Sequence, residues 1–372
     1  MARILIVTLE GGGNYPPEAA LGRELHRRGH HVRVLGHESQ RKVAEDAGLV
    51  FCSYRHSPPW TPHVELSTAK VLTMALAMTT DAAVARDVHD EITREPTDLV
   101  IVDCMLFNAQ DAAARTGVPH VVLFHTFFSA FDGSFRHGPF GIGARLRGLG
   151  PKRLWEQADM RLVCSDRVLD PAGRRHTNGS LIWTGAIHDA KAAAVGRTPP
   201  RVLVSLSTAG FPGQRRTYQS IFDAAAEMDA EFVVTTGPAI DPTGLRVPPN
   251  AAVRRYVPHH ELMPTCSVVV GHGGHATAFR ALAHGLPMLI MPMSAVTDQA
   301  MIGREVAKAG AGIRLRKTAS PEQVRAALNS LLTEDGYRTA AGELGVRLRG
   351  VDGASAAADR VLTLVDHRRT DH

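Results

Sequence analysis

The chain has 372 residues, of which 44% are hydrophobic and 21% are charged, and its formal net charge is +5 at pH 7. At roughly 100–200 residues per domain, this length predicts two domains that can each bury an ordinary core. Basic and acidic residues are interspersed rather than gathered into a basic arm. The composition therefore gives no reason to expect a nucleic-acid partner, and the charge indicates only a weak bias toward anionic ligands.

Four cysteines stand far apart in the sequence and form no C-x-x-C pair, which argues against a zinc site or a redox dithiol. We expect them to be reduced thiols in a cytoplasmic protein. The apolar run Ile4–Val7 is too short for a signal peptide. No other apolar stretch approaches the roughly 20 residues that span a bilayer, so we expect no membrane insertion.

In the first half, short apolar runs alternate with helical patterns, as in the βα units of parallel sheets. A helix opens at Pro16-Pro17 and is stopped by Gly29. Phe127 to Gly150 fits neither pattern, and we expect an irregular, aromatic-lined region there. The expected strands are Ile4–Val7, Val32–Leu35, Leu99–Val102 and Val121–Phe124.

The Ala-rich segment Asp189–Pro200 indicates an interdomain linker, after which the βα pattern restarts. Ser320, with a proline next and Gln323 at the third helical position, predicts a capping box. The expected strands of the second half are Val202–Leu206, Phe232–Thr235, Val253–Val257, Val268–Val270, Met288–Met291 and Ile313–Leu315.

The pattern predicts an α/β protein of two doubly wound, Rossmann-like domains that face each other across a cleft. We expect residues 1–188 and 201–350 to form the domains, residues 189–200 the linker, and residues 351–372 a helix that packs back on the N-terminal domain. Ligands of such sheets bind beyond the carboxyl ends of the strands, and the cleft is the default site.

The segment Val268–Thr277 carries the strongest signal for a ligand. A strand enters a turn at Gly273-Gly274 and continues as a helix through Ala276 and Thr277. A helix N-terminus has unpaired amides and a partial positive charge, so phosphate binds there readily. His272 and His275 add polar groups beyond what a turn needs, although a tight βα turn without a ligand remains the alternative.

Three weaker signals follow other strands of the same half. Asp298-Gln299 could bind sugar hydroxyls, or Asp298 could cap the next helix. Tyr256-Val257 could flank a base, or Tyr256 could be an ordinary surface residue. The hydroxyls and amides of Ser207-Thr208 could reach the same phosphate.

Together these residues resemble the signature of the family 1 glycosyltransferases of the GT-B fold, which runs H-G-G-x-x-T and then D-Q about twenty residues later. The match to His272–Thr277 and Asp298-Gln299 is specific, and it is closest to the antibiotic-modifying enzymes of actinobacteria. Similarity extends to the N-terminal half through Pro16 and Arg28-Gly29-His30, so it covers nearly the whole chain.

The resemblance implies an inverting glycosyltransferase that moves a sugar from a UDP- or dTDP-sugar to a lipophilic natural product. It implies that Asp298 and Gln299 hold the donor sugar and that Tyr256 and Val257 flank the base. No D-x-D motif occurs, so we expect no metal, and we expect no cofactor beside the nucleotide-sugar co-substrate. The implied diphosphate ligands are His272, Gly273, Gly274, His275, Ala276 and Thr277, with Ser207 and Thr208 from another loop.

One departure concerns the general base, because the family usually has G-H-x-x-P after the first strand. This chain has Asn14 in the place of the histidine, and asparagine takes up no proton at neutral pH. His125 and Asp103 end neighbouring strands and are the candidate replacements, since histidine suits base work and a desolvated carboxylate can also serve. The alternatives are that Asp103 caps a turn and His125 packs among phenylalanines, while Asn14 positions the acceptor.

We expect the acceptor on the N-terminal domain, against Phe124, Phe127, Phe128 and Trp60, although each phenylalanine could equally be a core residue. We allow for a homodimer. A catalytically silent nucleotide-binding partner of an active transferase is the main alternative function, motivated by Asn14. A dinucleotide-dependent oxidoreductase is a second, disfavoured because Gly11–Pro16 lacks the G-x-G-x-x-G spacing.

Overall fold

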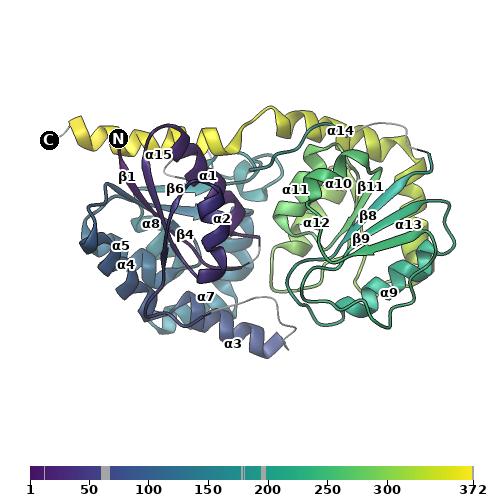
Figure 1. The fold of residues 1–372 in the computed structure, drawn as a ribbon, viewed down its shortest axis with the longest axis horizontal. Coiled ribbons are helices and arrows are strands. Elements are labelled where there is room, and N and C mark those ends of the chain that lie inside the picture. Colours follow the sequence, from purple (N-terminus) through teal and green to yellow (C-terminus); the bar gives the residue numbers. More distant parts are fainter. Residues whose placement is uncertain (12, 60–67, 177–178, 180, 194–197, 371–372) are drawn as a thin grey trace. The chain divides into compact units, whose positions relative to one another are not determined.

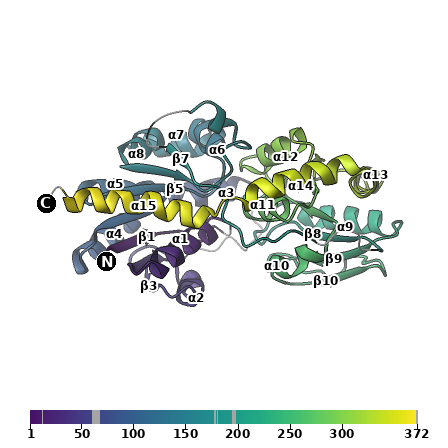
Figure 2. The same ribbon diagram turned by 90° about the horizontal axis from the view of Figure 1, so that it is seen from above.

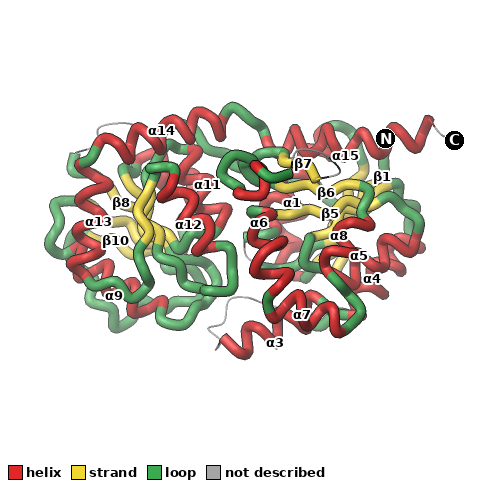
Figure 3. The backbone as a smooth tube through the Cα atoms, turned by 180° about the vertical axis from the view of Figure 1, so that it is seen from behind, coloured by secondary structure: helices red, strands yellow, loops and turns green. Residues whose placement is uncertain are grey.

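The computed structural model describes residues 1–370 except residues 12, 60–67, 177–178, 180 and 194–197 (Figure 1). These residues form two compact units. The first contains the described residues up to Ile187 and those from Asp352 onward, and the second runs from His188 to Val351. Each unit is a sheet of parallel strands with helices on both faces (Figure 3). The prediction of two doubly wound α/β domains is confirmed.

The sheet of the first unit has seven parallel strands in the order β3-β2-β1-β4-β5-β6-β7. The chain builds outward from β1 to β3, returns to the other side of β1 with β4, and continues to β7. The direction of winding therefore switches between β1 and β4. The strands are β1 (Arg3–Val7), β2 (His31–Gly36), β3 (Val50–Ser53), β4 (Leu99–Asp103), β5 (His120–Phe124), β6 (Met160–Val163) and β7 (Leu181–Trp183).

Alternate side chains of β1 bury against different helices, because successive strand residues point to opposite faces. Ile4 and Ile6 join a core with helices α1, α2 and α15, whereas Leu5 and Val7 join one with α4 and α5. The α-helices of this unit are α1 (Tyr15–Arg27), α2 (Arg41–Asp46), α3 (Thr68–Thr79), α4 (Ala82–Arg94), α5 (Phe107–Thr116), α6 (Phe128–Ala130), α7 (Pro139–Leu146), α8 (Pro151–Gln157) and α15 (Gly353–Thr370).

Helix α15 belongs to the first unit although it ends the chain, and it lies beside α1 (Figure 1 and Figure 2). Val361 and Val365 are buried in the same core as Leu21 and Leu25 of α1. At the end of α1, the Arg28 guanidinium donates to the Ser355 hydroxyl at 2.8 Å. The last helix thus covers one face of the first sheet.

The expectation of an irregular region between Phe127 and Gly150 is wrong. The chain there forms α6, a π-helical turn at Phe131–Phe135, and α7. The helical pattern is masked in the sequence by closely spaced glycines and aromatic residues, one of which, Gly133, departs from helical φ and ψ. Four phenylalanines of this region form a core with Trp155, namely Phe128, Phe131, Phe135 and Phe140.

The sheet of the second unit has six parallel strands in the order β10-β9-β8-β11-β12-β13, and its winding switches between β8 and β11. The strands are β8 (Arg201–Ser205), β9 (Glu231–Thr235), β10 (Ala251–Arg254), β11 (Val268–Gly271), β12 (Met288–Ile290) and β13 (Gly312–Arg314). The helices are α9 (Gln214–Ala225), α10 (His259–Leu262), α11 (His275–Ala283), α12 (Gln299–Lys308), α13 (Pro321–Thr333) and α14 (Asp335–Arg349).

The hydrogen bonds at the start of α13 agree with the prediction from the sequence. The Ser320 hydroxyl accepts the Gln323 amide, and the Gln323 side chain accepts the Ser320 amide, which is the predicted capping box. Asp189, the first residue of the expected linker, forms an ion pair with Arg280 of the second unit at 3.0 Å.

Among the described helices, none is long and apolar enough to cross a membrane.

A buried ion pair predicts where the first unit is most sensitive to substitution. The Arg33 guanidinium is fully buried and lies 2.5 Å from the Glu91 carboxylate. Glu91→Leu leaves this cation without its nearest partner, so we expect the first unit to lose about 3–5 kcal/mol of unfolding free energy. Urea denaturation followed by tryptophan fluorescence measures this loss, since all three tryptophans precede residue 188.

Glu45→Leu is the matched control, because Glu45 is an exposed partner of Arg41. We expect it to change the unfolding free energy by less than about 1 kcal/mol. Equal losses in the two variants would contradict a special role for the buried pair.

Candidate active site

Polar side chains of the first unit gather where the winding of its sheet switches. Parallel strands end at the same edge, and ligands of such sheets bind beyond the strand ends at the point where the winding switches. Asn14 lies in the loop after β1, Asp103 ends β4, and His125 follows β5. The structure thus brings together the two candidate bases, His125 and Asp103, and Asn14, which the sequence named to position the acceptor.

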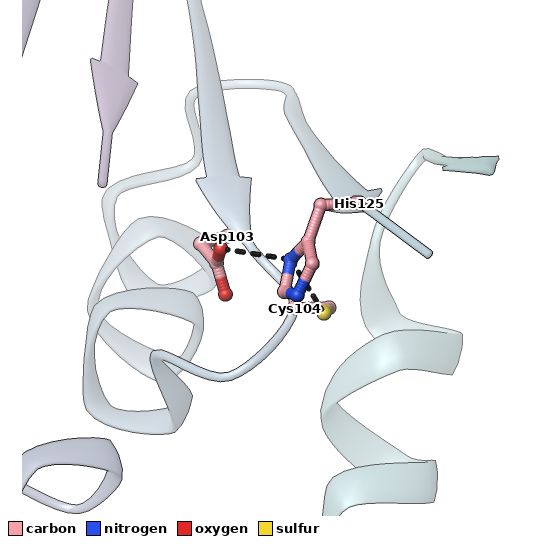
Figure 4. Close-up of side chains that lie close together, drawn as sticks. All are labelled: Asp103, Cys104 and His125. Carbon is pink, nitrogen blue, oxygen red and sulfur yellow. Dashed lines mark hydrogen bonds and ion pairs between the residues drawn. The ribbon is translucent and has the colours of Figure 1, made fainter. Parts of the chain in front are cut away.

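Asp103 and His125 form a hydrogen-bonded pair (Figure 4). Asp103 is fully buried, and its Oδ2 lies 3.2 Å from His125 Nδ1. The same oxygen accepts Asn14 Nδ2 at 3.1 Å, while Oδ1 accepts the Met105 amide at 2.7 Å. Three protein donors therefore fix the orientation of this carboxylate.

The surroundings keep Asp103 ionised. Burial alone would raise the pKa of its carboxyl, but His125 and the hydrogen bonds from Met105 and Asn14 together hold that pKa below its usual range. The His125 ring is packed edge-on against Phe131, with ring centres 5.4 Å apart. Because Nδ1 faces Asp103, Nε2 is the ring nitrogen left to take up a proton.

Asn14 occupies the place of the missing histidine and is almost fully buried. Its Nδ2 bridges the Leu9 carbonyl oxygen and Asp103. Among the described residues, no donor reaches its Oδ1. Asn14 therefore supports Asp103 through one end of its amide and offers a hydrogen-bond acceptor at the other.

The same cluster has the residue types of a metal site, since Asp103, Cys104 and His125 place ligand atoms within 4.8 Å of one another. Cys104 Sγ lies 3.9 Å from His125 Nδ1. However, burial raises the pKa of the Cys104 thiol well above its usual value, whereas a metal needs the thiolate. Both Asp103 oxygens already accept hydrogen bonds, so the residues fit a hydrogen-bonded cluster better than a metal centre.

In the second unit, the glycine turn also lies at the switch point of its sheet. Gly271 of β11 pairs with Ser205 of β8, so the loops after these two strands start side by side. Gly273 has φ +86°, and a Cβ there would lie 2.7 Å from the Gln299 carbonyl oxygen. Only glycine allows the turn to pack this closely against the start of α12. The turn delivers the chain into α11, whose first-turn amides have no intrahelical acceptor.

His272 stands in this turn as a neutral side chain. Burial, with a contribution from His259, lowers the pKa of His272 to about 4. Among the described residues, its Nδ1 has no hydrogen-bond partner. The ring has a hydrogen bond with the Ser205 backbone, so Nδ1 is the nitrogen left for a ligand, and the ring carries no positive charge at neutral pH.

The three residues that begin α11 differ in what their side chains contact. His275 is buried and stacks on Phe279 one turn later, with ring centres 4.1 Å apart. Its side chain is thus part of the packing of α11, and its amide is the group that the sequence prediction assigns to the diphosphate. Ala276 and Thr277 occupy the same first turn and are half-buried.

The loops after β8 and β12 flank the turn. Ser207 has φ +128°, a conformation that costs energy in a residue other than glycine, and its hydroxyl accepts the Ala209 amide. Thr208, which follows it, packs against Gly237. The Gln299 Oε1 accepts the Met293 and Ser294 amides at 2.8 and 3.0 Å, so it holds the loop.

Asp298 makes no side-chain capping bond at the start of α12, so the capping alternative is not realised. Tyr256 and Val257 follow β10, at the outer edge of the sheet, and Tyr256 is 71% exposed. The sheet order separates them from the glycine turn by two strands, so the strand ends alone do not bring them to it.

The expected acceptor surface is not supported by the structure. Phe124, Phe127 and Phe128 are buried, and Phe124 packs edge-on against Trp155 with ring centres 5.2 Å apart. They are core residues of the first unit, which is the alternative that the sequence leaves open for each phenylalanine. Trp60 lies outside the described residues.

Two polar groups beside these sites were missed by the sequence analysis. Glu18 of α1 is buried next to Asp103. Lys317 Nζ donates to the carbonyl oxygens of Pro212 and Met293 and so ties the loops after β8 and β12 together. Glu18 could have been found from the sequence, because it is an acidic residue on the buried face of an amphipathic helix. The residues around Lys317 in the sequence give no such indication.

Comparison with known proteins connects these sites to a family. A model of the erythromycin biosynthesis protein CIII-like C-terminal domain matches residues 219–348. The chain is 26% identical to 4'-demethylrebeccamycin synthase of Lentzea aerocolonigenes, over 98% of this chain and 100% of that protein. It is 36% identical to elloramycin glycosyltransferase ElmGT of Streptomyces olivaceus, over 48% of this chain and 46% of that protein.

Solved structures share the fold along the whole chain. The calicheamicin glycosyltransferase CalG4 superposes with a TM-score of 0.80 at 22% identity, covering 98% of both chains. The glycosyltransferase VinC, solved in complex with DTDP, gives a TM-score of 0.75 at 18% identity, covering 98% of this chain and 100% of VinC. With its two doubly wound sheets, its glycine-turn signature and relatives along its full length, the chain is a glycosyltransferase of the GT-B fold that is similar to antibiotic glycosyltransferases.

Proposed function

We propose that the protein is an inverting glycosyltransferase that transfers a sugar from a UDP- or dTDP-sugar to a hydroxyl or other nucleophile of a lipophilic natural product, without a metal ion. The observation that carries this proposal is the Asp103–His125 pair, which supplies a general base although Asn14 replaces the usual histidine. The names of the relatives, among them elloramycin glycosyltransferase, support a natural-product acceptor.

In this proposal His125 Nε2 takes the proton from the acceptor nucleophile. The nucleophile then bonds to the anomeric carbon of the donor sugar, while the bond from that carbon to the diphosphate oxygen breaks. Asp103 stabilises the imidazolium that forms, because its charge lies 3.2 Å from Nδ1. Attack from the face opposite the leaving group inverts the anomeric configuration.

The leaving nucleoside diphosphate gains negative charge, and the proposal assigns its stabilisation to the second unit. The first-turn amides of α11, the His272 ring, Thr277, and the Ser207-Thr208 loop provide hydrogen-bond donors for it. Asp298 and the Gln299 amide nitrogen would bind the donor sugar, and Tyr256 and Val257 the base. The DTDP complex of VinC supports a dTDP-sugar as one possible donor.

A catalytically silent partner protein was suggested only by Asn14. The structure disfavours this alternative, because Asn14 donates to the carboxylate that orients His125. The asparagine thus fits a rearranged base rather than a lost one.

The pair makes a direct prediction for turnover. His125→Ala removes the proton acceptor and Asp103→Asn removes the charge behind it, so we expect either change to lower kcat/KM by about 10²–10⁴-fold. Donor affinity should stay the same, because neither residue belongs to the proposed donor site. Steady-state kinetics and calorimetric titration with the nucleoside diphosphate measure the two quantities.

His137→Ala is the matched control, since His137 is an exposed histidine of the same unit. It should keep the wild-type rate. A His125→Ala variant that turns over at close to the wild-type rate would exclude His125 as the base.

The donor site makes a separate prediction. His272→Ala removes one ligand of the diphosphate, so we expect the Kd for UDP or dTDP to rise by about tenfold or more, which corresponds to about 1.4 kcal/mol. The shift in melting temperature at saturating nucleotide should shrink accordingly. His260→Ala, at an exposed histidine of the same unit, is the control. Unchanged nucleotide affinity in His272→Ala would remove this residue from the donor site.

A further inference from the structure

The carboxyl group of Glu18 is buried beside the Asp103–His125 pair and has no role in the mechanism above. Glu18 lies in the first turns of α1, and only 1% of its surface is exposed. A carboxylate is costly to bury unless it is paired with a cation or fully hydrogen-bonded. The contacts of the Glu18 side chain must therefore show how its burial is tolerated.

The hydrogen bonds around Glu18 are incomplete if it is ionised. Its Oε2 accepts the Thr8 hydroxyl. Among the described residues, no donor reaches its Oε1. The carboxyl group also lies within hydrogen-bonding reach of Asp103, which is itself an acceptor. A proton on Glu18 resolves both conflicts, because it turns the unsatisfied oxygen into a donor and removes the repulsion between two anions.

The charges around Glu18 agree with this assignment. Burial raises the pKa of Glu18 well above its usual value, the Asp103 charge raises it further, and the hydrogen bond from Thr8 opposes the shift only in part. The pKa of Asp103 is shifted the other way, so the two carboxyls are driven apart. Among the described residues, the titratable groups that interact with Glu18 are acids, namely Tyr15, Tyr54, Asp103, Cys104 and Cys164.

We propose that Glu18 is a carboxylic acid in the resting enzyme, donates a hydrogen bond to Asp103, and thereby keeps a single negative charge behind His125. Glu18 is then a positioning residue that acts through Asp103, with Thr8 holding its second oxygen. The catalytic part of this inference rests on the proposed function, in which His125 is the base. The protonation state of Glu18 does not depend on that function.

Glu18→Gln tests the proposal, because a carboxamide has the shape of the acid and can donate to Asp103 while accepting from Thr8. We expect kcat/KM to stay within about threefold of wild type. The acidic limb of its pH profile should stay within about 0.3 pH unit, since the net charge beside Asp103 is unchanged. If Glu18 were an anion, removing its charge would move that limb to lower pH by about one unit, and the proposal would be overturned.

Glu18→Leu removes the donor to Asp103 and is expected to lower kcat/KM by about tenfold or more, with the Kd for the nucleoside diphosphate unchanged. The pH profiles of the two variants separate the possible roles of Glu18. If Glu18 positions Asp103, the acidic limb of the pH profile shifts in Glu18→Leu but not in Glu18→Gln. A purely structural role would leave the limb unchanged in both. Wild-type kcat/KM in a folded Glu18→Leu variant would contradict the proposal.

Stability against pH tests the protonation state without any turnover. A carboxyl whose pKa is raised in the folded protein keeps a proton that the unfolded chain releases above the ordinary Glu pKa of 4.5. Wild-type stability therefore falls as pH rises above that value, and Glu18→Gln lacks this loss. We expect the variant to melt about 2–4 °C or more above wild type near pH 8, and the difference to vanish below about pH 4.

The two tests fail independently. A lower melting temperature for Glu18→Gln near pH 8 would show that the folded protein favours the anion, and would overturn the proposal whatever His125 does. A stabilised Glu18→Gln together with a fully active His125→Ala would instead reject the proposed base and leave the protonated acid in place.

Discussion

The site of the first unit depends on one buried carboxylate. Asp103 ends β4 in the middle of a parallel sheet, without access to solvent, and it remains charged because Asn14, His125 and the Met105 amide all direct donors at it. A buried charge without these partners would be strongly disfavoured. The same hydrogen bonds fix the ring of His125, so the stability of the carboxylate and the geometry of the base have one cause.

The two units solve different chemical tasks at the same topological position. In each sheet the polar groups lie at the carboxyl ends of the first, fourth and fifth strands of its 3-2-1-4-5 order, at and beside the point where the winding switches. The first unit gathers side chains to which we assign the transfer and stabilisation of a proton. The second relies on backbone, because Gly273 and Gly274 bring the start of α11 into a tight turn beside an uncharged His272. An anion there would be bound by neutral donors, whose effect depends on their fixed orientation.

Much of this arrangement could be predicted from the sequence, because it follows from local patterns. The strand runs placed Asp103 and His125 at neighbouring strand ends, and parallel pairing then had to bring them close. The glycine turn and the Ser320 capping box were readable for the same reason. The roles of individual side chains were less accessible, since the signature gives positions and not the direction in which His275 or Gln299 points.

The failures share a physical origin in tertiary packing. Phe124, Phe127 and Phe128 are buried, but the sequence leaves a core role and a ligand-binding role open for each, because hydrophobic residues that fill a core and those that line a pocket have the same composition. Glu18 was overlooked because its significance comes from Asp103, which is 85 residues away in sequence and adjacent only in the fold.

Chemical rescue tests the central account most directly. In His125→Ala, added imidazole can occupy the vacated space and accept the proton in place of the lost ring. We predict that it restores turnover by about tenfold or more, with a dependence on the concentration of the neutral imidazole form, and that it restores nothing in His272→Ala. A His125→Ala enzyme that is inactive and unaffected by imidazole at every concentration tested, while still folded and still binding the nucleotide, would contradict the assignment of His125 as the base.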